Sequence, residues 1–419
     1  MVMGKEKTLS VFKYILSFLK WTALGASAGV IVGLAGAAFA YCLQLVTDFR
    51  TAHPLLVLGL PLAGLLIVFL YHSAGIRESR GTNLVLASIR TDEPIPFAMA
   101  PLIFAGTVLT HLFGGSAGRE GAALQLGGSI AQNLARRLRL SSGSRKLLTM
   151  CGMSACFSAL FGTPMSAAFF AMEVISVGIM HYSALVPCAV ASVTAAYLSR
   201  LLGIAPARFS VSGIPSEFSV PTMLRVFALA ALCAGVSILF CVVLKYTSAF
   251  YASCFKNSYL RAACGGILVA VFAMILRSQD YLGAGTQIIT RAFAGEAVPL
   301  AFLLKIIFTA ITLEAGFKGG EIVPTFFIGA TFGCTAGALL GLNPSFAAAV
   351  GMLCLFCGVT NCPITTLFLS LELFGARGLL WYFLATAVSY MLSGYFSLYS
   401  KQKIMYSKVA PEFIDITAH

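Results

Sequence analysis

Apolar runs separated by short polar connections extend from near the N-terminus of this chain to near its C-terminus. An α-helix needs roughly 20 apolar residues to cross the hydrocarbon core of a bilayer. Runs near that length, and some shorter, cover residues 14–45, 54–71, 184–198, 226–243 and 379–391. Inside lipid every backbone polar group needs an internal partner, so such a chain folds as a bundle of helices. We therefore expect an all-α, polytopic membrane protein.

The charged residues support this class and exclude others. They make up 10% of the 419 residues, whereas soluble domains carry about 25%. The formal net charge is +13, and Lys and Arg cluster at residues 136–139, 145–146 and 401–408. Such clusters beside apolar spans indicate the cytoplasmic side of a membrane, and we expect no nucleic-acid partner. The 12 cysteines lie mostly in apolar runs and the 5 histidines are scattered, so we expect no metal and no cofactor.

The sequence repeats itself. Six residues recur at a single offset of 199 positions (351 minus 152), and three more recur at an offset of 201 (321 minus 120). The first set is Gly152, Met153, Phe157, Pro164, Phe169 and Glu173, which recur as Gly351, Met352, Phe356, Pro363, Phe368 and Glu372. The second set is Gly118, Glu120 and Gly128, which recur as Gly319, Glu321 and Gly329. Matches in the same order across two blocks indicate an internal duplication.

The longest polar stretch, residues 205–221, separates the two copies. We expect an N-terminal tail at residues 1–12, a first membrane repeat at 13–204, a linker at 205–220, a second membrane repeat at 221–410 and a C-terminal tail at 411–419. The basic tail leads into a run that is too long for a cleavable signal peptide. Repeats in membrane proteins often have opposite topology, with the binding site between them near the bilayer midplane.

Each repeat contains a glycine-rich break before an apolar helix. The breaks are residues 114–121, Gly-Gly-Ser-Ala-Gly-Arg-Glu-Gly, and residues 316–324, Gly-Phe-Lys-Gly-Gly-Glu-Ile-Val-Pro. Glycine lets the backbone leave helical geometry, and the free N–H groups at the next helix start can bind an anion. Glycines also permit close helix packing in membranes, and that alternative stays open for either break alone. Two breaks with matched carboxylates favour an anion site between the repeats.

Five of the 15 acidic residues lie in or beside apolar segments: Glu120, Glu173, Glu314, Glu321 and Glu372. Ionisable groups at membrane depth are costly and are functional hypotheses by default. An ionised glutamate beside an anion site can take the anion's place, and its protonated form can leave, which couples anion movement to proton movement. We expect this role for Glu120. For Glu173 and Glu372 we favour capping of a nearby helix start or a hydrogen bond to the backbone, and for Glu314 a structural role.

At these residues the chain resembles the CLC family of chloride channels and anion/proton exchangers. The break Gly118-Arg119-Glu120-Gly121 is similar to the family's signature loop, whose glutamate is the external gate. The second break takes the place of a later signature, and residues 164–173 match the family's next helix. The first signature corresponds to Gly81-Thr82-Asn83, with Thr82 in the place of an anion-contacting serine. Tyr406, in Ile404-Met405-Tyr406-Ser407, falls where the family has its anion-binding tyrosine.

Three departures from the common family pattern indicate one particular branch of the CLC family. Ala122 stands where proline normally follows the gate loop, Val174 replaces the inner proton glutamate of exchangers, and Glu321 lies inside the second signature. Together they resemble the fluoride/proton antiporter branch, which protects bacteria from fluoride. The hydroxyl of Thr82 is closer to the chloride pattern, because members of that branch often place methionine there. The alternative is therefore a chloride channel or a chloride/proton exchanger.

The resemblance implies a CLC-type fold of about 18 helices in two inverted-topology repeats. It also implies a homodimer and a multi-pass location in the cell inner membrane. Gating and proton coupling would fall to Glu120 and Glu321. The expected partners are fluoride or chloride, protons and the lipid bilayer. The expected anion-binding residues are Gly81, Thr82, Asn83, Gly118, Arg119, Gly121, Ala122, Ile322, Val323 and Tyr406.

An intramembrane enzyme is the competing class. Gly152-Met153-Ser154-Ala155 weakly resembles the serine motif of rhomboid-type proteases. The glycine after the serine is missing, and no histidine lies in a plausible partner helix. We therefore expect a transporter without catalytic residues.

Overall fold

The computed structural model describes residues 2–76 and 80–419, with side chains from residue 11 onward. Within these residues the chain forms sixteen α-helices and two short 3-10 helices, η1 (Pro54–Gly59) and η2 (Tyr182–Ala184). This count agrees with the expected arrangement of roughly eighteen helices. The first eight α-helices are α1 (Val2–Ala52), α2 (Leu60–Ser73), α3 (Thr82–Thr91), α4 (Met99–Leu112), α5 (Glu120–Arg137), α6 (Ser142–Phe161), α7 (Pro164–Glu173) and α8 (Leu185–Leu201).

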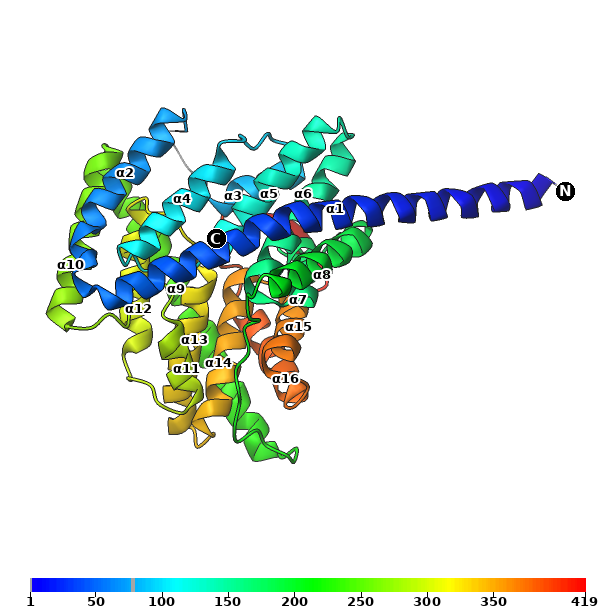
Figure 1. Cartoon of the computed structure of the whole chain (residues 1–419). Coiled ribbons are helices and arrows are strands. Elements are labelled where there is room, and N and C mark those ends of the chain that lie inside the picture. Colours follow the sequence, from blue (N-terminus) through cyan, green and yellow to red (C-terminus); the bar gives the residue numbers. More distant parts are fainter. Residues whose placement is uncertain (1, 77–79) are drawn as a thin grey trace.

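The second eight α-helices follow a connection, residues 202–219, that contains no helix or strand. They are α9 (Val220–Cys254), α10 (Ser258–Leu276), α11 (Thr286–Phe293), α12 (Ala301–Glu314), α13 (Ile322–Leu339), α14 (Pro344–Thr360), α15 (Pro363–Phe374) and α16 (Leu379–Leu392). Each helix of the first set therefore has a counterpart in the second, in the same order. The two sets pack into one body, from which the N-terminal part of α1 projects (Figure 1).

The local sequence signals for helix ends also repeat. α7 and α15 both begin with proline, Pro164 and Pro363, whose fixed φ suits the first helical position. α6 and α14 both end at a residue with left-handed backbone geometry, Gly162 at φ 68° and Asn361 at φ 59°. Glycine and asparagine are the residues that adopt this geometry most easily at a helix end. The duplicated sequence thus sets the same helix boundaries twice.

The two repeats have opposite directions. Glu173, the last residue of α7, accepts hydrogen bonds from the backbone N–H groups of Ile364 (3.1 Å) and Thr365 (2.8 Å) at the start of α15. Glu372, near the end of α15, accepts the corresponding bonds from Met165 (2.8 Å) and Ser166 (2.9 Å) at the start of α7. Each glutamate thus caps the free amides of its partner helix. The capping role expected for Glu173 and Glu372 is confirmed.

Matched helices that cap each other's starts must run antiparallel. Phe169 of α7 and Phe368 of α15, which occupy one repeat position, stack with ring centres 4.3 Å apart and planes 7° apart. A residue stacked on its own counterpart lies beside an approximate two-fold axis. The inverted-topology arrangement is therefore confirmed for the described residues.

Paired glycines allow the longer helices to pack closely. A Cβ atom added to Gly152 of α6 would lie 2.2 Å from the carbonyl oxygen of Gly127 of α5. In the second repeat, a Cβ atom on Gly351 of α14 would lie 2.3 Å from the carbonyl oxygen of Gly329 of α13. Small residues that permit such backbone contact are typical of helix pairs in membranes.

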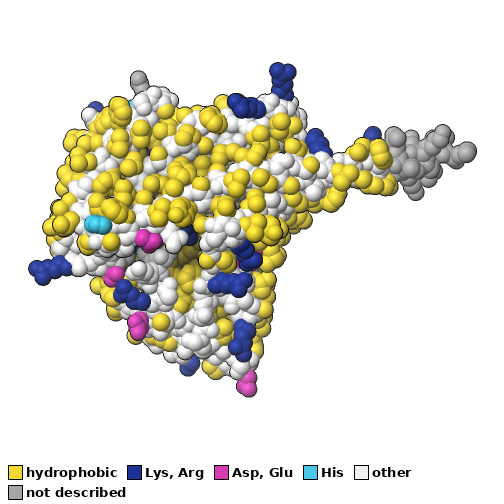
Figure 2. Space-filling view, in the orientation of Figure 1, with side chains coloured by type: hydrophobic (Ala, Val, Ile, Leu, Met, Phe, Trp, Pro, Cys, Tyr) yellow, Lys and Arg dark blue, Asp and Glu magenta, His cyan; other side chains and the backbone are white. Residues whose placement is uncertain are grey.

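Much of the outer surface is apolar. Six helical segments of the described chain are long and apolar enough to cross a membrane, and they belong to α1, the η1–α2 and η2–α8 segments, α9, α10 and α13. Large apolar side chains such as Leu62 (70% exposed) and Ile275 (71%) lie on the outside. Figure 2 shows a broad area of hydrophobic side chains with few charges on it. The protein is thus a multi-pass membrane protein, as expected.

The C-terminal segment forms a small sheet. Its strands are β1 (Ser176–Val177), β2 (Lys403–Tyr406) and β3 (Phe413–Thr417), in the order β1-β2-β3. β1 and β2 are parallel, whereas β2 and β3 are antiparallel. The segment that we expected as a tail, residues 411–419, thus contains a strand, which pairs with β2, and β2 in turn pairs with the strand after α7.

The glycine pair between α5 and α6 gives a test of the packing. Gly152→Ala places a Cβ atom against the Gly127 carbonyl oxygen, so we expect a loss of about 1–3 kcal/mol of stability from overpacking. The measurement is the thermal unfolding midpoint of the purified protein in detergent. Gly235→Ala is the matched control, because a Cβ atom there would contact nothing within 4 Å. An equal midpoint for both variants would contradict the assigned packing.

Candidate anion site

The two glycine-rich breaks lie against each other at the centre of the fold. The N–H of Gly118 donates to the carbonyl oxygen of Gly320 (2.7 Å), and the N–H of Gly320 donates to that of Gly118 (2.8 Å). A Cβ atom on Gly320 would lie 2.3 Å from the nitrogen of Gly121. Glycine is thus required for this approach, which brings the starts of α5 and α13 together. The first-turn amides and the positive dipole ends of both helices are concentrated there.

Glu120 fills the space at the start of α13. Its side chain is fully buried, and Oε2 accepts hydrogen bonds from the backbone N–H groups of Arg119 (3.0 Å) and Val323 (3.3 Å). Oε1 has no hydrogen-bond partner among the described residues, and the Arg119 Nε lies 3.5 Å from it. The carboxylate therefore uses an amide of the second repeat that a small anion could use in its absence.

Glu321 takes the corresponding position at the start of α5. It is the residue immediately before α13, and a Cβ atom on Gly121 would lie 3.0 Å from its Oε2. This Oε2 is buried and has no hydrogen-bond partner among the described residues. Since a buried carboxylate without partners is costly, a proton or a second polar group would stabilise this position. Two neighbouring buried carboxyl groups also resist being ionised together.

A cavity of about 310 Å³ reaches Glu321 from one side of the protein. We call it the vestibule. Its inner wall contains Gly81, Thr82, Gln125, Glu321 and Tyr399, and its other lining residues include Arg80, Asn83, Glu314, Lys318 and Lys401. α3 begins at Thr82 on this wall, so a third helix start faces the cavity. Gln125 is 3% exposed, and its Oε1 has no hydrogen-bond partner among the described residues.

The structure does not place Tyr406 at the vestibule. Tyr406 lies in β2, is 46% exposed and packs against Phe413 of β3, with ring centres 5.5 Å apart. Tyr399 lines the vestibule instead, is 1% exposed and has no partner for its hydroxyl among the described residues. The cause is the backbone after α16, where residues 403–406 extend into a strand. The tyrosine that faces the glutamates therefore comes seven positions earlier than expected.

The structure brings most of the other expected residues together. Thr82 Oγ1 donates to the carbonyl oxygen of Gly121 (3.4 Å). Asn83 Oδ1 accepts a hydrogen bond from the N–H of Lys401 (3.0 Å), which holds the segment that carries Tyr399. The Arg119 guanidinium lies over the Phe161 ring at 5.8 Å and is 28% exposed. Ala122 is fully buried on α5.

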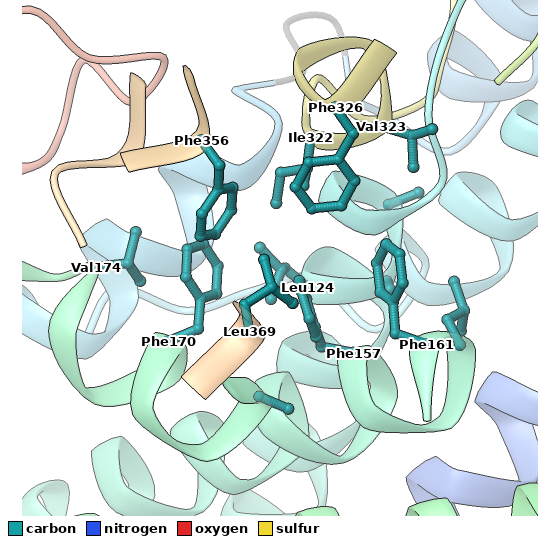
Figure 3. Packing of buried hydrophobic residues seen from close by; sticks show 14 of the residues in the cluster. Leu124, Phe157, Phe161, Phe170, Val174, Ile322, Val323, Phe326, Phe356 and Leu369 are labelled. Carbon is teal, nitrogen blue, oxygen red and sulfur yellow. The ribbon is translucent and has the colours of Figure 1, made fainter. Parts of the chain in front are cut away.

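The wall beyond Glu120 is apolar. Ile322 and Val323 are buried at the start of α13 beside a cluster of aromatic rings from both repeats (Figure 3). Phe326 lies 6.0 Å from Phe161 and 5.5 Å from Phe356, measured between ring centres. An apolar wall lowers the local dielectric and strengthens the interaction of amide dipoles with a dehydrated anion.

Sequence reasoning missed Gln125 and Tyr399. Gln125 Nε2 donates to the carbonyl oxygen of Gly121 (3.1 Å), one turn earlier in α5, so a polar residue one turn after the break was the available signal. Tyr399 had no comparable signal, because it follows α16 without helical periodicity. No group of three His, Cys, Asp or Glu side chains in the described chain is arranged to hold a metal ion.

Comparisons with known proteins agree with this geometry. Residues 63–394 match the voltage gated chloride channel family. A chloride/fluoride channel protein of Pseudomonas syringae pv. tomato is 34% identical over 416 residues, which cover 96% of this chain and 90% of that protein. The crystal structure of a CLC-type fluoride/proton antiporter has a TM-score of 0.88 and 32% identity, and it covers 92% of this chain and 98% of that one.

A more distant structure shares the fold. The crystal structure of a slow cyanobacterial Cl⁻/H⁺ antiporter has a TM-score of 0.78 at 16% identity, and the match covers 89% of this chain and 94% of that one. The family match spans well over half of the chain, and the matched region contains both glycine breaks. The chain therefore belongs to the voltage gated chloride channel, or CLC, family of anion transport proteins.

Proposed function

We propose that the protein is a fluoride/proton antiporter that exports fluoride across the cell inner membrane. The observation that carries this proposal is the hydrogen bond from the N–H of Val323 to the Glu120 carboxylate, beside the second buried carboxyl group of Glu321. The likeness to a solved fluoride/proton antiporter and to a chloride/fluoride channel protein supports it. The proposed activity involves no covalent chemistry.

The proposed transport cycle follows from competition between the Glu120 carboxylate and fluoride for the same backbone amide at the start of α13. When Glu120 is ionised, its carboxylate occupies the α13 amide and blocks the anion path. Protonation removes its charge and weakens the bond to the amide, because hydrogen bonds to charged groups are the stronger ones. Glu120 then leaves, and fluoride entering through the vestibule takes the amide. The return of Glu120 requires loss of its proton, so one anion movement is linked to one proton movement.

Glu321 has a second part in this proposal. Its carboxyl group lies between the vestibule and the start of α5, so an arriving anion must pass it. A protonated carboxyl group donates a hydrogen bond, and fluoride is a small, strong acceptor. We therefore propose that Glu321 carries a proton when fluoride passes. The carboxyl group would favour fluoride over larger halides that accept hydrogen bonds more weakly.

A chloride channel or chloride/proton exchanger is the second candidate. The hydroxyl of Thr82 at the start of α3 favours it, since this group lines the vestibule where an anion would lose water. In both candidates the anion-binding groups are Gly81, Thr82, Asn83, Gly118, Arg119, Gly121, Ala122, Ile322 and Val323, to which we add Gln125 and Tyr399.

We also propose a homodimer with one pathway in each subunit. α8 and α16 carry large exposed apolar side chains, among them Val193 (56%), Tyr197 (64%), Leu380 (56%) and Phe383 (50%). Their partner would be the same surface of a second copy, as in a two-fold symmetric interface. The resemblance to the CLC family supports this assembly.

Anion choice gives the first test. In proteoliposomes loaded with a single anion, we expect faster efflux with fluoride than with chloride, because Glu321 donates a stronger hydrogen bond to fluoride. An anion-selective electrode outside the vesicles measures the flux, and protein-free vesicles give the background. Faster chloride than fluoride efflux would assign the protein to the second candidate.

Removal of the gate carboxylate gives the second test. Glu120→Gln cannot ionise, so an inward fluoride gradient should no longer drive protons uphill, and the proton signal should fall to that of protein-free vesicles. A pH-sensitive dye inside the vesicles reports this signal. Glu296→Gln, in the exposed connection before α12, is the control and should keep full coupling. Proton movement that persists in Glu120→Gln would remove Glu120 from the coupling mechanism.

The two tyrosines give the third test. Tyr399→Phe removes a buried hydroxyl from the vestibule, and loss of one hydrogen bond to an anion costs about 1.5–3 kcal/mol. We therefore expect anion affinity, measured by isothermal titration calorimetry, to fall by about 10- to 150-fold. Tyr406→Phe should leave the affinity unchanged, because Tyr406 lies in β2. The reverse pattern would restore Tyr406 as the anion ligand.

A further inference from the structure

A second polar cavity, of about 530 Å³, lies beside the vestibule at one end of α2 and α10. We call it the side cavity. Leu313, Glu314 and Lys318 line both cavities, so the two share a wall. The other polar side chains of the side cavity are Tyr71, His72, Ser248, Lys256, Ser258 and Arg261. The proposed transport cycle uses none of these.

The side cavity carries excess positive charge. Its described lining includes three cations, Lys256, Arg261 and Lys318, but one carboxylate, Glu314. One histidine, His72, also lines it. Within the described chain, none of the three cations forms a salt bridge. Such a cavity is complementary to a group that carries at least one negative charge and several acceptor oxygens.

Two polar groups in the side cavity have no hydrogen-bond partner among the described residues. Tyr71 is 4% exposed, and its hydroxyl has no hydrogen-bond partner among the described residues. The buried Nε of Arg261 also has none. The Lys318 ammonium lies 4.5 Å from the centre of the Tyr71 ring, which places a cation beside the tyrosine. Buried polar groups are normally satisfied, so a hydroxyl donor and a guanidinium in one cavity indicate an oxygen-rich ligand.

The position of the side cavity identifies the source of that ligand. α2 and α10 lie side by side at the edge of the protein (Figure 1). Their outer faces expose apolar residues such as Leu62 (70%), Phe69 (57%) and Ile275 (71%), which suit lipid tails. The cavity lies where both spans end, at Ser73 and at Ser258. A lipid packed along these helices thus has its headgroup beside the cavity.

We propose that the side cavity binds the phosphate-bearing headgroup of an anionic phospholipid. Lys256 and Arg261 contact the phosphate oxygens, and the Tyr71 hydroxyl donates to one of them. Basic pockets between membrane helices recognise anionic headgroups in this way. Because Lys318 precedes Glu321 by three residues in the same break, the bound headgroup lies against the loop that carries the second carboxylate.

The test measures thermal unfolding of the full-length protein in detergent, with phosphatidylglycerol, phosphatidylcholine or inorganic phosphate added. We expect phosphatidylglycerol alone to raise the unfolding midpoint, since ligand binding to the folded state stabilises it. In a Lys256→Gln/Arg261→Gln variant the affinity for phosphatidylglycerol should fall by about 25-fold, at roughly fivefold for each charge. Arg277→Gln, which changes an exposed arginine at the opposite end of α10, is the matched control and should respond like the unmodified protein.

The outcomes separate the possible ligands. An equal response of Lys256→Gln/Arg261→Gln and the unmodified protein would overturn the proposal. An equal effect of inorganic phosphate or phosphatidylcholine would also overturn it, because the site would then not select an anionic lipid. If the double variant unfolds without lipid, Tyr71→Phe takes its place. This variant removes only the hydroxyl, and an undiminished response to phosphatidylglycerol would likewise refute the assignment.

Discussion

Two backbone hydrogen bonds between Gly118 and Gly320 hold the starts of α5 and α13 face to face. Both helices therefore direct first-turn amides, which have no partner within their own helix, toward one small region inside the protein. Side chains cannot enter the contact, because a Cβ atom on Gly118, Gly121 or Gly320 would meet another atom at 3.0 Å or less. The amides consequently need a negative group, and in this structure Glu120 supplies it.

The surroundings of the site increase the stabilisation that a negative group gives to these amides. One side of the site is the apolar wall of Ile322, Val323 and the aromatic cluster, where water cannot satisfy the amides. The other side is the polar vestibule, with Thr82, Gln125 and Tyr399. In the proposed cycle, an anion that arrives from the vestibule would exchange water for hydroxyl, amide and backbone donors. The gradient from polar to apolar surroundings thus favours an ion that sheds its hydration shell in steps.

The sequence predicted the parts that repeat or that depend on composition. The duplicated motifs gave the two-repeat architecture, and a carboxylate at the end of an apolar helix gave the caps Glu173 and Glu372, because both signals are local. The close approach of Glu120 and Glu321 was expected from the repeat and from the family resemblance. Tyr399 was missed, since an irregular segment has no period that tells which of several tyrosines turns inward. Gln125 was missed because one polar residue in an apolar helix does not reveal its direction.

The reciprocal caps at α7 and α15 bear on how such a protein arises. Every bond from α15 to Glu173 has a counterpart from α7 to Glu372, so at this contact the two repeats contribute the same groups. A single ancestral half could therefore have made the same bonds with an identical chain inserted upside down. Gene fusion would only have joined a pair that was already complementary, after which the two copies were free to diverge in sequence.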